Sequence, residues 1–161
     1  MTNPATSPND IDVAGPGPMP WWMKTFNPIA ERLLAAGVPL GFNGLITIRG
    51  RRTGIERTTP VAIIASDGRR WVWAPYGDVQ WVRNLRVAGK AMITTHRRTE
   101  EVMARELDQL ERIAFFRDVV GPIARDMPGG VWFIRTFDRT DLTDPAGAAH
   151  GRPVFELSPR H

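Results

Sequence analysis

The sequence predicts an α+β domain in which a mostly antiparallel sheet curls into a small barrel with flanking helices. Three observations support this fold class. Short segments rich in β-branched and aromatic residues follow one another between residues 45 and 108, and turn sequences separate them. Strands joined by tight turns are antiparallel, because parallel strands need long crossover connections. Helical patterns precede and follow the strands, so helices should fill the ends and one side of the barrel.

The length and composition fit one folded domain. Of the 161 residues, 42% are hydrophobic and 24% charged, as in an ordinary globular protein, and there is no cysteine. Residues 1–19 mix Pro, Gly, Asn, Ser and Thr without apolar periodicity, which predicts a flexible leader before a single domain over residues 20–161. We expect a cytoplasmic protein, because neither a signal peptide nor a membrane-spanning run is present.

The first helix is predicted just after two tryptophans. Asn27 can cap it, Pro28 suits its first position, and Gly37 ends it. Trp21 and Trp22 lead into this helix, where they either pack it across the sheet or make weak contact with a membrane surface.

Three antiparallel strands are predicted over residues 45–49, 59–66 and 70–75. The turn sequence GRRTG follows the first strand, and Asp67-Gly68, a strong hairpin signal, follows the second. A short helix over residues 81–89 and a second hairpin turning at Arg98-Thr99 come next.

The remaining elements are another helix and a last strand. Asp108 and Glu111 form a capping pair for a helix that Gly121-Pro122 should stop. Residues 122–152 give only weak signals, and residues 153–157 predict the last strand.

A local cluster of arginines is the main candidate site. The chain has 21 Lys and Arg against 17 Asp and Glu, although a GC-rich genome would also favour arginine codons. Arg49, Arg51, Arg52 and Arg57 fall within nine positions and are opposed only by Glu56. The glycine-bounded turn in their middle exposes N–H groups, and guanidinium groups bind phosphate or carboxylate. The cluster therefore indicates either an anion site or a solvated basic turn.

Other familiar sites are absent from the sequence. No strand precedes the leader glycines as a dinucleotide fingerprint requires, and there is no G-x-S-x-G nucleophile motif. His96, His150 and His161 lack the spacing of metal ligands, so no metal site is predicted. Nucleic-acid binding is disfavoured because the aromatic residues do not interleave with the arginines.

The motifs resemble one known family. In order, the chain carries G-R-R-T-G-x-x-R-x-x-P at Gly50–Pro60, A-P-Y-G at Ala74–Gly77 and W-x-x-N-L at Trp81–Leu85. This series resembles the deazaflavin (coenzyme F420)-dependent nitroreductase family. The family's members are mostly actinobacterial split β-barrels, related to flavin-reductase and FMN-binding barrels, that pass the hydride of reduced F420 to quinones or nitroaromatics.

The resemblance implies a set of cofactor-binding residues. Phosphate and glutamate-tail contacts would fall on the arginine turn, the deazaflavin ring would lie along the following strand and the A-P-Y-G loop, and three residues near the second helix would close the pocket. These residues are Arg51, Arg52, Thr53 and Arg57 for the anions; Thr58, Thr59, Pro60, Val61, Ala62, Ala74, Pro75, Tyr76 and Gly77 for the ring; and Gln80, Trp81 and Asn84 for closure.

The acceptor side departs from the family pattern. Family members usually carry tyrosines near the acceptor, whereas the only tyrosine here is Tyr76, our candidate catalytic residue. Trp21, Trp22, Trp132 and Phe133 are candidates for lining the acceptor pocket.

The leading hypothesis is an oxidoreductase that uses reduced F420 to reduce an apolar small molecule. The alternatives are an FMN-binding split-barrel reductase and a non-catalytic deazaflavin carrier.

Overall fold

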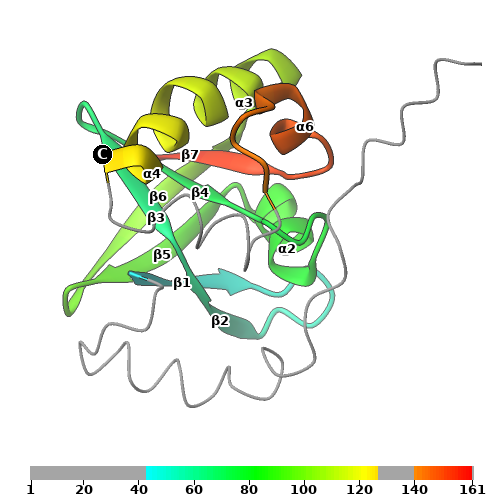
Figure 1. Ribbon diagram of the computed structural model, residues 1–161. Helices are drawn as coiled ribbons and strands as arrows, with labels where there is room; N and C mark the ends of the chain where they lie inside the picture. Colours follow the sequence, from blue (N-terminus) through cyan, green and yellow to red (C-terminus); the bar gives the residue numbers. More distant parts are fainter. Residues whose placement is uncertain (1–42, 127–139, 161) are drawn as a thin grey trace, which may run out of the picture.

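A seven-stranded sheet organises the part of the chain that the computed structural model describes, residues 43–126 and 140–160 (Figure 1). The strand order is β2-β1-β5-β6-β7-β4-β3, and every neighbouring pair is antiparallel. The strands are β1 (Gly44–Arg49), β2 (Glu56–Val61), β3 (Ile63–Ser66), β4 (Arg69–Trp73), β5 (Lys90–Thr95), β6 (Arg98–Glu106) and β7 (Val154–Pro159).

The two edges of this sheet are held together by the chain itself. β2 and β3 are the outermost strands of the order, yet only Ala62 separates Val61 from Ile63. Two peptide units span at most about 7 Å, so the edges meet and the sheet curls into a barrel. The split-barrel prediction is confirmed.

One predicted strand is in fact two. Residues 59–66 were expected to form a single strand, but the run breaks at Ala62, where the chain leaves β1 as its partner and joins β4. The prediction of three strands in this region is therefore wrong in number, since it holds the four strands β1 to β4. The β-branched pattern continues through the break, and such a pattern does not reveal a change of pairing partner.

Asn43 closes the seam where the two edges meet. Its side-chain amide donates to the Ile63 carbonyl and accepts from the Ile63 N–H, both at 2.6 Å. The next residue is glycine because space is short: a Cβ on Gly44 would lie 2.8 Å from Ile63 Cδ1 and 3.2 Å from the Thr94 carbonyl. The side chain of Asn43 thus continues the strand pairing past the end of β1.

Helices cover one side and one end of the barrel (Figure 1). Asp108 and Glu111 form the predicted capping box of α3, with both reciprocal bonds at 2.9 Å. The helices are α2 (Gln80–Ala88), α3 (Gln109–Phe115), the π-helical turn η1 (Phe116–Val120), α4 (Gly121–Asp126) and α6 (Pro145–Ala149), which the sequence did not predict.

The helical chain does not stop at Gly121-Pro122, contrary to the prediction. In the wide turn η1 the N–H of Gly121 donates to the Phe116 carbonyl, five residues back. A wide turn relaxes the normal helical bonding pattern, so a proline, which has no N–H, can follow it.

Two apolar clusters stabilise the fold. The barrel interior buries aliphatic side chains, among them Ile46, Ile93 and Val102, each fully inaccessible. A second cluster lies under α3 and η1, where Trp73 stacks on Phe116 with ring centroids 4.8 Å apart.

The two hairpin turns differ in chemistry. The predicted Asp67-Gly68 turn is confirmed, with φ of 51° and 74°. The second turn lies at His96-Arg97, not at Arg98-Thr99 as predicted, and its φ angles are 48° and 65°. Two-residue turns at these angles are usually built from Asn, Asp or Gly, so His-Arg carries no hairpin signal in the sequence.

Several sequence predictions fall outside the described residues. These are the leader, the helix that follows Asn27, and the candidate acceptor residues Trp21, Trp22, Trp132 and Phe133. Among the helices of the described ranges, none is long and apolar enough to cross a membrane.

The seam predicts the cost of removing one side chain. Asn43→Ala should lower the free energy of unfolding by about 1–3 kcal/mol, because it leaves the N–H and carbonyl of buried Ile63 without partners. Urea denaturation measures this loss. Ser66→Ala, which removes an exposed bond to Asp67, is the control and should change stability little. Equal stability of Asn43→Ala and the parent would refute the stabilising role of the Asn43 side chain at the seam.

Candidate functional site

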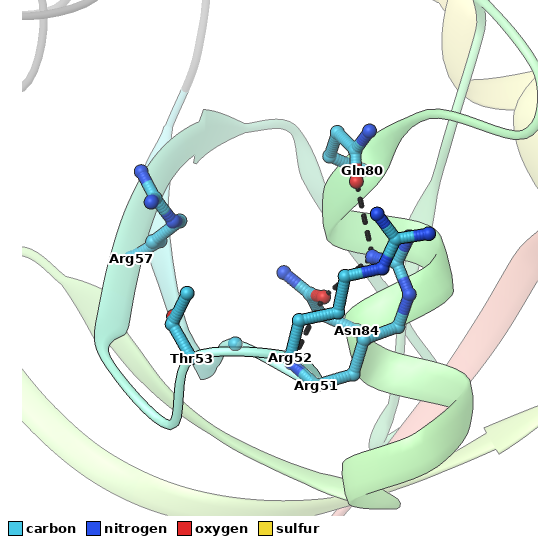
Figure 2. Close-up of a pocket in the computed structure, with 7 residues that line it drawn as sticks. Arg51, Arg52, Thr53, Arg57, Gln80 and Asn84 are labelled. Carbon is cyan, nitrogen blue, oxygen red and sulfur yellow. Dashed lines mark hydrogen bonds between the residues drawn. The ribbon is translucent and has the colours of Figure 1, made fainter.

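A cavity of about 380 Å³ lies between the β1–β2 turn and the first turns of α2 (Figure 2). It unites residues from two segments that are distant in the sequence. They are Gly50, Arg51, Arg52, Thr53 and Arg57 from the turn and β2, and Gln80 and Asn84 from α2.

Glycines shape the arginine turn, Gly50–Gly54. The N–H of Gly50 donates to the Ile55 carbonyl at 2.8 Å, and the N–H of Gly54 donates to the Gly50 carbonyl at 2.9 Å. Gly54 has φ of +69°, and a Cβ on Gly50 would lie 3.0 Å from the Ile55 carbonyl oxygen. Within the described chain, the N–H groups of Arg52 and Thr53 have no acceptor, so both can donate to a ligand.

Helix α2 presents two amides to the cavity. Gln80 and Asn84 are one turn apart and share a face, while Val82 and Leu85 anchor another face in the barrel core. The N-cap residue Val79 makes no side-chain cap bond, which leaves the first N–H groups of the helix without a side-chain acceptor.

Arg51 joins the turn to this helix. Its Nη1 donates to Gln80 Oε1 at 3.0 Å and to Asn84 Oδ1 at 2.9 Å, and its main-chain N–H donates to the same Asn84 oxygen at 3.3 Å (Figure 2). Because the oxygen of Asn84 faces Arg51, its amide nitrogen points toward the side of the cavity that carries Thr53 and Arg57 (Figure 2). Arg51 is therefore a brace, and Asn84 offers donors to the cavity.

The electrostatics of the turn differ from those of the remaining surface. Within the described ranges, Arg49, Arg51, Arg52 and Arg57 form no salt bridge. Many other arginines do pair with carboxylates, namely Arg69, Arg70, Arg83, Arg86, Arg105, Arg117 and Arg160. None of the residues found to line the cavity is acidic, so an anion there meets guanidinium, amide and hydroxyl groups and no carboxylate among them.

Strand β2 divides the predicted ring-binding residues between two faces. Arg57 is opposite the buried Ile48 in the β1–β2 register, so alternation places Thr59 and Val61 on the same barrel-facing side. Thr58 and Pro60 take the other side, where Thr58 bonds the hydroxyl of Thr47 at 2.7 Å. A ligand that extends along β2 from Arg57 would meet Thr59 next, whereas Val61 is buried in the barrel core and Thr58 and Pro60 take the other side.

The loop Ala74–Gly77 connects β4 to α2 and is tightly built. Ala74 is buried, the N–H of Gly77 donates to its carbonyl at 3.1 Å, and Gly77 has φ of +81°. Tyr76 is half-buried in this loop, and Trp81 packs against Phe155 with ring centroids 6.3 Å apart.

The structure brings together six of the predicted cofactor residues in one cavity. These are Arg51, Arg52, Thr53, Arg57, Gln80 and Asn84. The others do not line it, namely Thr58, Thr59, Pro60, Val61, Ala62, Ala74, Pro75, Tyr76, Gly77 and Trp81. Their role in binding stays a prediction.

A smaller hollow of about 260 Å³ adjoins the cavity and was not foreseen. Gly50 and Arg51 line both spaces, and Arg49, Gly54, Val87 and Ala88 complete the second. Arg49 belongs to the arginine cluster, but the apolar residues at the end of α2 carry no sequence signal of a site.

An ion-pair network lies beside the cavity, at the start of α2. Asp78 accepts from Arg83 Nε at 2.8 Å and pairs with Arg86 as well. The hydrogen bond from Arg83 lowers the pKa of Asp78, so this carboxylate is ionised at neutral pH.

Comparison with known proteins gives the fold a context. No curated protein matches the chain. A solved protein described as a domain-swapped dimer is 19% identical with a TM-score of 0.51, over 85% of this chain and 97% of that one. An F420-H2 dependent reductase is 18% identical with a TM-score of 0.47, over 71% and 92% of the two chains.

Residues 22–126 match the family model described as F420H(2)-dependent quinone reductase. The match includes both segments that form the cavity and covers more than half of the chain, and it confirms the resemblance to F420-dependent enzymes. The chain therefore belongs to the F420H(2)-dependent quinone reductase family, a family of F420-dependent reductases.

Proposed function

We propose that this protein binds reduced F420 through the cavity at the arginine turn and reduces an apolar acceptor such as a quinone or a nitroaromatic. One observation carries the proposal: arginines that form no salt bridge within residues 43–126 and 140–160 face the amides of Gln80 and Asn84, which Arg51 holds in place. Family membership supports the cofactor, and it gives no support to the alternative of FMN.

The cavity suits the anionic part of this cofactor. The phosphodiester and glutamate tail of F420 need hydrogen-bond donors and positive charge, and the cavity supplies guanidinium groups, the Asn84 amide and two main-chain N–H groups. In this proposal Arg52, Thr53, Arg57 and Asn84 contact the anions. Arg51 contributes positive charge, but its Nη1 already donates to the side-chain oxygens of Gln80 and Asn84.

Reduced F420, when bound, supplies the hydride. The protein's own part is to neutralise the tail, to orient the cofactor and to provide a proton. Thr59, on the face of β2 that carries Arg57, extends the site toward the barrel interior, where Val61 is part of the core. Tyr76 lies a few residues before Gln80, which lines the cavity, so we propose its hydroxyl as the group that hydrogen-bonds or protonates the acceptor.

The identity of the acceptor rests on the family. A quinone is favoured by the family's description, and a nitroaromatic by the resemblance of the motifs. A non-catalytic carrier would share the cavity but would not oxidise bound F420H2 when quinone is added. Loss of F420H2 absorbance on addition of menadione separates the two, and binding without turnover would contradict the enzymatic proposal.

The anion contacts predict a salt-sensitive affinity. Arg52→Ala and Arg57→Ala should each weaken F420 binding roughly 10- to 150-fold, the range for a charge-assisted hydrogen bond. Affinity of the parent should also fall as salt rises, since exposed charges are screened over about 8–10 Å at ordinary ionic strength. Fluorescence titration measures both effects. Arg98→Ala, a change at the far hairpin, is the control; parent-like binding by both turn variants would refute the contacts.

Asn84 predicts an effect of charge at constant size. Asn84→Asp should keep the bonds from Arg51 but remove two amide donors and add a negative charge beside the ligand. We expect F420 affinity to fall at least about 100-fold, by calorimetry, with little change in melting temperature. Gln80→Glu places a similar charge at the exposed rim and should have a smaller effect. Tighter binding by Asn84→Asp would be incompatible with an anion at this position.

Tyr76→Phe tests the proton donor. The substitution keeps the ring and removes only the hydroxyl, so turnover should fall about 100-fold or more while F420 affinity stays nearly unchanged. Steady-state kinetics and a binding titration together measure this difference. Turnover within about threefold of the parent would assign Tyr76 to packing.

A further inference from the structure

Arg86 is clamped between carboxylates from two other parts of the fold. Its Nε and Nη2 donate to the two carboxylate oxygens of Glu106 at 2.7 and 2.8 Å, and its Nη1 donates to Asp78 Oδ1 at 2.5 Å. Glu106 ends β6, and Asp78 follows the loop Ala74–Gly77. One guanidinium thus joins the barrel, α2 and the loop before it.

The connected segments carry the residues of the proposed site. Gln80 and Asn84 line the cavity from α2, and Tyr76 belongs to the loop. The 3.6-residue helical repeat places Arg86 on a different side of α2 from Gln80 and Asn84. Arg51 therefore holds the helix from the turn side, and Arg86 holds it from the β6 side.

The network fixes position more than it stabilises the fold. The side chains of Arg86, Asp78 and Glu106 are 39%, 50% and 30% exposed, and exposed ion pairs contribute little to global stability. A two-pronged arginine–carboxylate contact nevertheless defines direction as well as distance. Val82 and Leu85 hold one face of α2 in the core, but no side chain caps its first turn, so the ion pairs of Arg86 add a directional contact on another face.

We propose that Arg86 is a positioning residue of the cofactor site, which acts through Asp78 and Glu106 to hold the loop Ala74–Gly77 and the amides of α2. The inference rests on the proposed function only for the identity of the ligand. The positioning itself is a property of the protein without ligand.

The chain offers a matched control for this test. Arg105, the neighbour of Glu106 on β6, is likewise held between two carboxylates, Glu111 at 3.0 Å and Glu156 at 2.8 Å, but these lie away from α2. Arg86→Lys and Arg105→Lys both keep the charge and lose the two-pronged contact. We expect similar, small losses of melting temperature in the two variants.

Hydrogen–deuterium exchange of the free proteins measures how firmly α2 and the loop before it are held. Amides of residues 74–88 should exchange at least about fivefold faster in Arg86→Lys than in the parent, and at the parent's rate in Arg105→Lys. Glu106→Gln removes the same two-pronged contact from the barrel side and should reproduce the faster exchange. It keeps the test available if Arg86→Lys folds poorly.

Cofactor binding supplies the second readout. The dissociation constant for F420 should rise roughly 5- to 20-fold in Arg86→Lys, with an unchanged salt dependence because the charge is kept, and should not change in Arg105→Lys. Parent-like exchange of α2 in both Arg86→Lys and Glu106→Gln would overturn the inference. Equal changes in α2 exchange and in F420 affinity for Arg86→Lys and Arg105→Lys would overturn it as well. Failure of the parent itself to bind F420 would instead overturn the proposed function.

Discussion

The closure of the sheet at Ala62 is the constraint on which the rest of the structure depends. A single bent segment supplies both edge strands, β2 and β3, so the barrel closes through covalent continuity and needs only the Asn43 side chain to complete the seam. Closure fixes the direction of β2 between the arginine turn, Gly50–Gly54, and Ala62. The turn lies beside α2, and a cavity forms between them.

The site uses this geometry in a simple way. A glycine-bounded turn displays donors, a helix presents two amides, and Arg51 spans the gap so that the two halves keep their spacing. Elsewhere in the described chain, surface arginines are largely neutralised by carboxylates, which concentrates uncompensated positive charge at the turn. Arginines that form no salt bridge within the described protein remain available to an anionic ligand. Arg86, on the other side of α2, is paired with Asp78 and Glu106, and the role proposed for it is to position the helix.

Local chemistry was predictable from the sequence, whereas long-range pairing was not. The glycines and arginines of Gly50–Gly54, the Asp67-Gly68 turn and the Asp108–Glu111 cap each act within a few residues, so their patterns are visible in the chain. The break at Ala62 was invisible because both halves have strand composition. The pairing of Arg51 with Asn84 joins residues 33 positions apart, and only the resemblance of the motifs suggested that these residues meet. The sequence alone does not show which residues of β2 face the barrel. The register with β1 shows it, and Thr58 and Pro60 lie on the side opposite Arg57.

The most direct test compares F420 with a deazaflavin fragment that lacks the phosphodiester and the glutamate tail. If the arginine turn holds the anionic part, the parent should bind the complete cofactor at least about 100-fold more tightly than the fragment, as two charge-assisted hydrogen bonds allow. Arg52→Ala combined with Arg57→Ala should lose most of this preference and keep its affinity for the fragment. Equal affinity of the parent for both ligands, or a preference that survives in the double variant, would contradict the account.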